Sequence, residues 1–207
     1  PTAHLRRLLL DGSQVTDVGL RSLRSCPQLR FLSLEHTGVT DGGIESLRPQ
    51  PQLEHLHLSD THVTDDALRH MNKFPALRCL GLERTAVSDS GLADIESILS
   101  LKRLNLEGTA ITDAGVVHLR GLTHLEELDL TGTQVADDGL RHLNGLRELY
   151  RLRLTDTLVT DAGMKHLEKL PKLQVIRLEG TQVTDAGYRN LLVRRPKRIV
   201  TPFSLLD

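Results

Sequence analysis

The sequence predicts an α/β solenoid, in which eight strand-and-helix units stack in one right-handed β-α superhelix. Three observations predict it. A valine or isoleucine recurs at an unbroken interval of 24 residues from Val15 to Val183. Leucines precede it in the spacing Leu-x-x-Leu-x-Leu, and Thr-Asp or a close variant follows it. A fixed period of roughly 20 to 29 residues with regular leucines is typical of a repeat array.

The leucine segment predicts one short strand in each unit. It runs from Leu5 to Leu10 in the first unit and, with one isoleucine, from Leu173 to Leu178 in the last. Apolar and polar residues alternate in its second half, as in Leu128-Asp129-Leu130, which is the period of a strand whose leucines face the core. Strands repeated in register predict a parallel sheet.

A turn and a helix start are expected after each strand. A Ser or Thr such as Thr181 comes first, and its hydroxyl can bond backbone groups in a tight turn. The Thr of Thr-Asp is expected to cap the helix, and the Asp to complement its positive end. Ala136 replaces this Thr in the sixth unit, so we expect that helix to be the least well capped unless Asp137 takes over. Glycine follows in seven of the eight units, and we expect it to mark close approach of helix and sheet.

Stacking the units predicts the overall shape. No unit can bury its leucines alone, so neighbouring units must share a core. Helices are wider than strands, and the stack should therefore bend into a horseshoe with a concave parallel sheet and convex helices. We expect residues 1–193 to form this array and residues 194–207 to form a C-terminal capping segment. The basic run Arg194–Arg198 is interpreted as the solvated edge of that cap, in preference to a nuclear-import or anionic-lipid patch.

The pattern Leu-x-x-Leu-x-Leu-x-x-Thr-x-Val-Thr-Asp-x-Gly-Leu resembles leucine-rich repeat proteins over essentially the whole chain. Its Thr-Asp-x-Gly-Leu half is most similar to the cysteine-containing subclass found in F-box adaptors and to 24-residue repeats of some bacterial proteins. Two departures matter. At the turn position where leucine-rich repeats usually have a Cys or Asn in each unit, this sequence has Thr. An F-box-like segment is not present.

Composition argues against several classes of function. A net charge of −1 and an aromatic content of 2% disfavour non-specific nucleic-acid binding, and no apolar run is long enough to predict a membrane span. Cys26 and Cys79 fall at different phases of the repeat and are not expected to pair, which favours an intracellular, cytoplasmic location. The chain starts at Pro1 with no cap before Leu5, so we expect it to be cut from a longer protein.

Side chains that alternate with the buried leucines are expected to face solvent on the concave side. Side chains at the same position of successive units form a column that runs along the array. In the first two columns, which alternate with the strand leucines, the residues change between apolar, cationic and anionic types. The residues we expect to contact a partner are Phe31, His55, His57, Arg103, Glu127, Asp129, Tyr150, Arg151, Arg153 and Arg177.

Two patches are expected within these columns. Units two to four offer Phe31, the two histidines and Cys79, which form a softer patch. Units seven and eight offer Tyr150 and three arginines, which form a cationic patch of the residue types enriched at binding hot spots. Glu127 and Asp129 lie between the patches and are expected to meet Arg103 and Arg151 across the strands.

His55 and His57 share one face of a strand, and Cys79 lies one strand over, so the three could supply metal ligands. We do not favour a metal site from the sequence, because no second spaced pair and no obvious carboxylate holding either imidazole is visible. The sequence also has no Gly-rich phosphate loop, nucleophile elbow or plausible carboxylate pair. No cofactor is predicted, and the chain is not expected to be an enzyme.

The leading hypothesis is a protein–protein interaction module that binds one partner through the concave face. One alternative is the substrate-recognition half of a larger adaptor, such as an F-box-type ubiquitin-ligase receptor, which requires an F-box-like segment upstream of Pro1. Another is a structural array that self-associates end to end through its uncapped N-terminal repeat.

Overall fold

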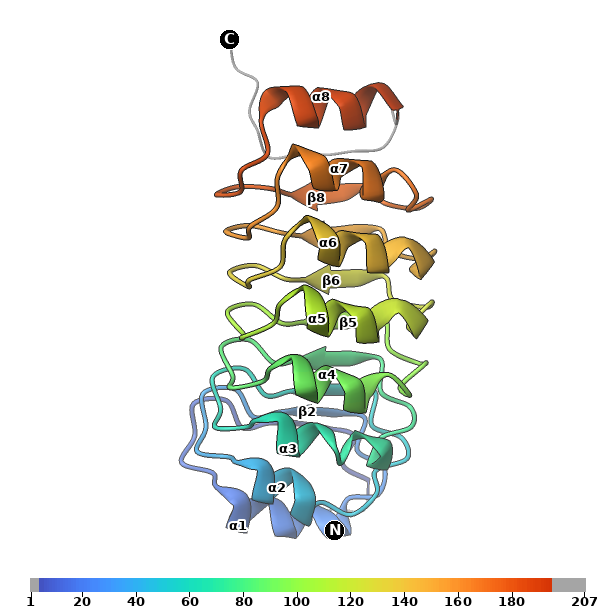
Figure 1. Cartoon of the computed structure of the whole chain (residues 1–207). Helices are drawn as coiled ribbons and strands as arrows, with labels where there is room; N and C mark the ends of the chain where they lie inside the picture. The colour runs from blue at the N-terminus through green and yellow to red at the C-terminus, as the bar shows by residue number, and fades with distance from the viewer. Residues whose placement is uncertain (1–3, 195–207) are drawn as a thin grey trace.

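The computed structural model describes residues 4–194, which form one continuous array of parallel strands and helices. The eight strands lie side by side in chain order, and a helix follows each of them on the opposite side of the array (Figure 1). The predicted solenoid is therefore confirmed. The predicted cap over residues 194–207 and the basic run to Arg198 fall, beyond Arg194, outside the described residues, as does Pro1.

Each strand is three residues long and pairs with its neighbours 24 positions away, so equivalent residues of successive units lie level with one another. The strands are β1 (Arg7–Leu9), β2 (Phe31–Ser33), β3 (His55–His57), β4 (Cys79–Gly81), β5 (Arg103–Asn105), β6 (Glu127–Asp129), β7 (Arg151–Arg153) and β8 (Val175–Arg177).

The helices begin at the Asp of the repeated Thr-Asp phrase or at its equivalent. They are α1 (Asp17–Leu20), α2 (Asp41–Ser46), α3 (Asp65–Leu68), α4 (Asp89–Ile95), α5 (Asp113–Val116), α6 (Asp137–Leu140), α7 (Asp161–Leu167) and α8 (Asp185–Arg194). In four units a 3-10 helix follows: η1 (Arg21–Ser25), η2 (Met71–Lys73), η3 (Val117–Gly121) and η4 (Arg141–Gly145). None of the helices within residues 4–194 has the length and apolar character needed to cross a membrane.

One hydrophobic core runs through the described array from Leu20 to Leu191. The strand leucines face it, as Leu56 and Leu58 show with no exposed surface. The turn hydroxyls behave as predicted, because Thr61 Oγ1 donates to the Leu58 carbonyl oxygen at 2.6 Å. The same bond recurs at Thr37, Thr85, Thr109, Thr133, Thr157 and Thr181.

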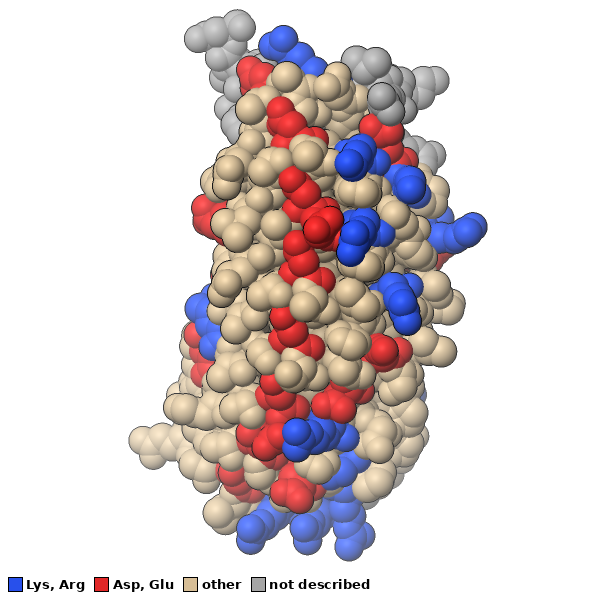
Figure 2. Space-filling model, viewed as in Figure 1, with Lys and Arg blue, Asp and Glu red and all other residues tan. Residues whose placement is uncertain are grey.

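The aspartates of the Thr-Asp phrase link each unit to the next. Asp137 Oδ1 accepts the Thr160 backbone N–H at 2.8 Å, and its Oδ2 accepts the Thr160 hydroxyl at 2.7 Å. We call this series of contacts the aspartate ladder; its carboxylates are those of Asp17, Asp41, Asp65, Asp89, Asp113, Asp137 and Asp161. A column of acidic side chains follows the array on its helical side (Figure 2). Their place at the positive end of each helix was expected from the sequence, whereas their bonds to the next unit were not.

The recurring glycine is explained by the same carboxylates. A Cβ built at Gly139 would lie 2.5 Å from Asp113 Oδ1 and 3.0 Å from Val135 Cγ1. Equivalent glycines of the later units face the preceding aspartate in the same way. The close approach is thus between one helix and the carboxylate of the unit before it, and not mainly between helix and sheet as expected. In the third unit, where Ala67 replaces glycine, Asp41 Oδ1 also accepts the Ala67 N–H at 3.2 Å.

The expectation for helix caps is correct only in part. Thr160 caps α7 by accepting the Ala162 N–H at 3.2 Å, and similar caps start α2, α3 and α5. Ala136 offers α6 no side-chain cap, but neither Thr16 nor Ser88 caps its helix, so α6 is not exceptional. Asp137 does not take over the cap, because its carboxylate bonds Thr160.

We predict that Asp137→Ala lowers the free energy of unfolding by about 1–3 kcal/mol, because it removes two hydrogen bonds that a charged group accepts from the next unit. Asp138→Ala is the matched control: its carboxylate is 76% exposed and pairs with Arg141 at 3.6 Å, so its loss should change stability by less than about 0.5 kcal/mol. Urea unfolding followed by circular dichroism measures both, and equal losses would contradict the ladder.

Candidate functional site

The sheet face, which is the concave side of the array, carries two columns of outward side chains. The register aligns Phe31, His55, Cys79, Arg103, Glu127 and Arg151 in the first column. Ser33, His57, Gly81, Asn105, Asp129, Arg153 and Arg177 form the second. The residues expected to contact a partner all lie in these columns, apart from Tyr150, which directly precedes β7.

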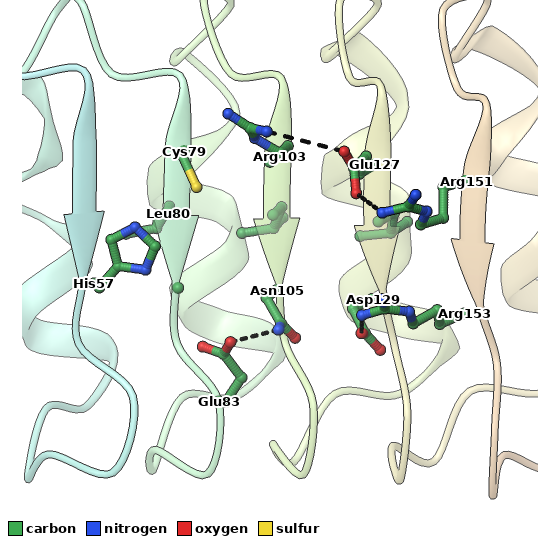
Figure 3. Close-up of a pocket in the computed structure, with 13 residues that line it drawn as sticks. His57, Cys79, Leu80, Glu83, Arg103, Asn105, Glu127, Asp129, Arg151 and Arg153 are labelled. Atoms are coloured by element: carbon green, nitrogen blue, oxygen red, sulfur yellow. Dashed lines mark hydrogen bonds and ion pairs between the residues drawn. The ribbon is translucent and has the colours of Figure 1, made fainter. Parts of the chain in front are cut away.

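A hollow of about 160 Å³ lies in the middle of the sheet face (Figure 3). His57, Cys79, Arg103 and Asn105 surround it, and Gly81 lies between His57 and Asn105 in the second column. Gly81 has no side chain, and the side chains of its neighbours lean over it: a Cβ built there would lie 2.9 Å from Glu83 Oε2 and 3.4 Å from His57 Nδ1. Gly81 was not among the expected site residues, although a glycine in a column of larger side chains is a signal that could have found it.

The acidic residues beside the hollow hold most of the arginines. Glu127 accepts bonds from Arg151 at 2.7 Å and from the Tyr150 hydroxyl at 2.6 Å. This bond to Glu127, together with some burial, raises the pKa of Tyr150. Arg103 approaches Glu127 only at 4.0 Å. The expected meeting of Glu127 with both arginines is therefore observed, but one of the two contacts is at the limit of an ion pair.

Asp129 does not meet Arg103 or Arg151 as expected. It pairs with Arg153 at 2.7 Å, because the register places these two residues opposite each other in the second column. The Asp129 side chain is only 7% exposed, and the bond it accepts raises the pKa of Arg153. Arg177 pairs with Glu179 at 3.2 Å. The expected cationic patch is therefore largely neutralised by its own neighbours.

Arg103 differs from these arginines. Its side chain is 51% exposed, and its contact with Glu127 is the longest of the ion pairs described above. It also lies beside Cys79, where burial raises the pKa of the thiol and Arg103 partly opposes that rise. Arg103 is thus the arginine in the hollow with the most freedom to meet an external group.

Phe31, His55 and His57 form an ordered cluster on the adjacent strands. The Phe31 ring lies 5.4 Å from the His55 ring and 5.2 Å from the His57 ring, between centroids. The guanidinium of Arg7 covers Phe31 at 4.2 Å from its centroid. Burial, aided by Arg103 and His57, lowers the pKa of His55.

One expectation about this cluster is wrong. His57 Nδ1 lies 3.3 Å from Glu35 Oε1, so a carboxylate does hold one of the imidazoles. Glu35 lies two residues beyond the end of β2, and its contact with His57 was not expected from the sequence. Both cysteines are free, as expected, and Cys26 is buried in the core.

Comparison with known proteins agrees with this architecture. The Leucine Rich repeat family matches residues 25–47, 98–119 and 121–143. Internalin C2 from Listeria monocytogenes is similar in structure, with a TM-score of 0.77 and 24% identity over 97% of this chain and 81% of that protein. An internalin (inlF) from the same organism gives a TM-score of 0.69 and 17% identity over 96% of this chain.

This chain spans 61% of the length of the second internalin. No curated protein sequence matches it significantly. At these identities the likeness concerns the fold.

We predict that Arg153→Gln lowers the free energy of unfolding by about 1–3 kcal/mol, because it leaves the nearly buried Asp129 carboxylate without its charged partner. Arg177→Gln is the control in the next strand of the same column, since its pair with Glu179 is exposed and should contribute less than about 0.5 kcal/mol. Chemical unfolding of both variants measures the difference. A harmless Arg153→Gln would show that this arginine is available to a partner after all.

Proposed function

Because the chain is a leucine-rich repeat protein, we propose that it is a protein-binding module whose concave sheet face contacts its partner. Domains of this fold typically mediate protein binding and are typically non-catalytic. The proposal is supported most directly by one observation: a small hollow lies within a wide face of differing, partly exposed side chains.

The size of the hollow favours a protein partner over a small-molecule ligand. Sites for drug-sized molecules usually measure roughly 300–1,000 Å³ and are mostly apolar, whereas this hollow measures about 160 Å³. A neighbouring hollow of about 460 Å³ on the same face is lined by polar and charged residues alone, among them Arg153, Arg177 and Glu179. The volume of the smaller hollow suits one or two side chains of a partner. The rest of the face can then contact the surrounding surface of the same partner.

The sheet face is also held together by its own contacts. Its strands share one continuous core and one uninterrupted sheet, and the pairs Glu127–Arg151 and Asp129–Arg153 fix several side chains in place. Ordering side chains at an interface costs about 0.5–1.5 kcal/mol each. A face that is already ordered avoids much of that cost.

Arg103 is the residue we expect to contribute most to partner binding. Arginine is enriched at binding hot spots, especially in desolvated pockets, and Arg103 is half exposed beside the hollow with a loose internal partner. Its guanidinium suits a carboxylate of the partner, because such pairs are often bidentate.

We predict that Arg103→Glu weakens partner binding at least about tenfold, since it replaces an attractive charge at the hollow by a repulsive one. A partner is first recovered by affinity capture with the wild-type chain and identified by mass spectrometry. Its binding to purified variants is then measured by isothermal titration calorimetry.

Arg141→Glu is the matched control on the helical side. Arg141 is 55% exposed and pairs with Asp138 at 3.6 Å, which closely resembles the setting of Arg103. We expect this variant to keep wild-type affinity. If Arg103→Glu binds as well as the wild type, or if Arg141→Glu loses as much affinity, the partner does not use the sheet face as proposed.

A further inference from the structure

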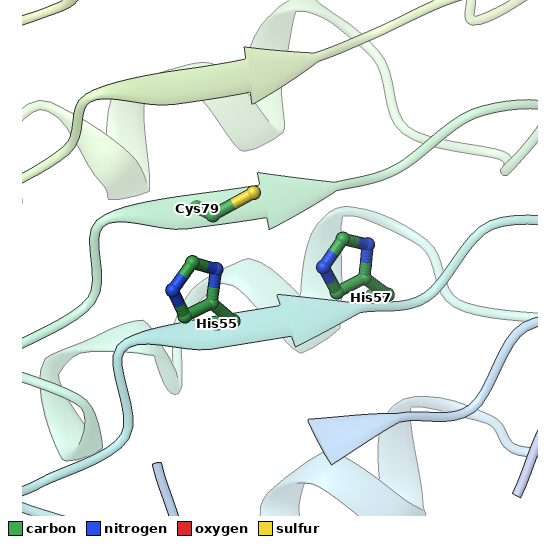
Figure 4. A group of neighbouring side chains, drawn as sticks. All are labelled: His55, His57 and Cys79. Atoms are coloured by element: carbon green, nitrogen blue, oxygen red, sulfur yellow. The ribbon is translucent and has the colours of Figure 1, made fainter. Parts of the chain in front are cut away.

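We propose that His55, His57 and Cys79 form a zinc-binding site on the sheet face. One nitrogen of each imidazole and the Cys79 sulfur lie within 4.8 Å of one another. They extend from two adjacent strands, β3 and β4, toward a common region above the sheet (Figure 4). This proposal does not depend on protein binding by the sheet face, because metal binding can be measured on the isolated chain.

The distances suit a tetrahedral zinc ion after small side-chain rotations. Zinc binds imidazole nitrogen at about 2.0–2.1 Å and thiolate sulfur at about 2.3 Å, which places tetrahedral donors about 3.3–3.6 Å apart. Donor atoms that lie within 4.8 Å of one another therefore need to close by up to about 1.5 Å. The strand backbones need not move, because His55 and Cys79 are already paired across the two strands.

Two neighbours hold the imidazoles near this arrangement. Phe31 packs against the rings of both His55 and His57 from the neighbouring strand, opposite to the strand of Cys79. Glu35 lies 3.3 Å from His57 Nδ1, which leaves Nε2 as the donor available to a metal. A metal-binding histidine almost always gives its other ring nitrogen to such a carboxylate, carbonyl or water.

The donor set favours zinc over other abundant divalent cations. Two imidazoles and one thiolate are borderline-soft ligands, whereas magnesium and calcium prefer oxygen donors. Three protein ligands leave a fourth position, which on this open face water can occupy. Arg103 lies near the thiol and repels a cation there, and burial raises the pKa of the Cys79 thiol, a rise that Arg103 only partly opposes. Zinc therefore has to displace the thiol proton, as a coordinating metal ion does.

Other histidines of the array lack this combination. His118 is also held by a carboxylate, with Nδ1 3.4 Å from Glu96 Oε1, and it is similarly exposed. Among residues 4–194, however, His118 does not belong to a cluster of metal-ligating side chains. The cluster found there consists of His55, His57 and Cys79, whose donor atoms converge. His118 therefore provides a matched control for a carboxylate-held surface imidazole.

The test is titration of the full chain, without a polyhistidine tag and under thiol-reducing conditions, with Co²⁺ and then Zn²⁺. We expect one equivalent of Co²⁺ to produce two spectral features. One is a thiolate-to-cobalt charge-transfer band in the near ultraviolet, and the other is the set of visible bands typical of a tetrahedral Co²⁺ ion. Stoichiometric Zn²⁺ should then displace the cobalt and remove these bands.

Variants assign the ligands. Cys79→Ser should abolish the thiolate band, and His55→Gln or His57→Gln should abolish one-to-one binding. Glu35→Gln should weaken zinc binding about 10- to 100-fold. His118→Gln should leave affinity and spectrum unchanged, and circular dichroism confirms that each variant is folded. Absence of saturable one-to-one binding by the wild type, or a thiolate band that persists in folded Cys79→Ser, would overturn the proposal.

Discussion

The contact on which the rest of the array depends is the bond from each helix-start aspartate to the next unit. Asp113, for example, accepts the Ala136 N–H at 2.7 Å across a 23-residue separation. This contact fixes how far one helix lies from the next, and it also requires little bulk at positions such as Gly139. Together with the strand pairing on the other side, it keeps every unit in the same register. The columns of the sheet face exist because that register never slips.

Much of the fold could be predicted because the repeat is strict. A period of 24 residues with fixed leucines dictates strand, turn, core position and helix start, and each of these is found where expected. The role of the aspartate could not be predicted so easily. A residue such as Asp137 satisfies the rule for a helix N-terminus by itself, and nothing in one unit shows that its partner, Thr160, lies in the next.

The sheet face could be predicted only in outline. Alternation placed the outward residues correctly, but their charges compensate one another in ways that depend on exact pairing. Asp129 lies opposite Arg153 and not Arg103, and this one-column difference turns an expected cationic patch into a neutral network. The Glu35–His57 contact likewise joins two columns that alternation treats as independent. Among the arginines of the hollow, Arg103 keeps the most exposed side chain and the longest internal ion pair.

The most direct test of the aspartate ladder is a substitution that should raise stability, and the sixth unit provides the position for it. Ala136 lacks the hydroxyl that its equivalents donate to the preceding carboxylate, although its N–H still bonds Asp113. The ladder predicts that Ala136→Thr raises the free energy of unfolding by about 1 kcal/mol in urea denaturation. It also predicts a clearly smaller gain in an Asp113→Ala background, where the new hydroxyl can still cap α6 but has no carboxylate to bond. No gain, or an equal gain in both backgrounds, would contradict the account.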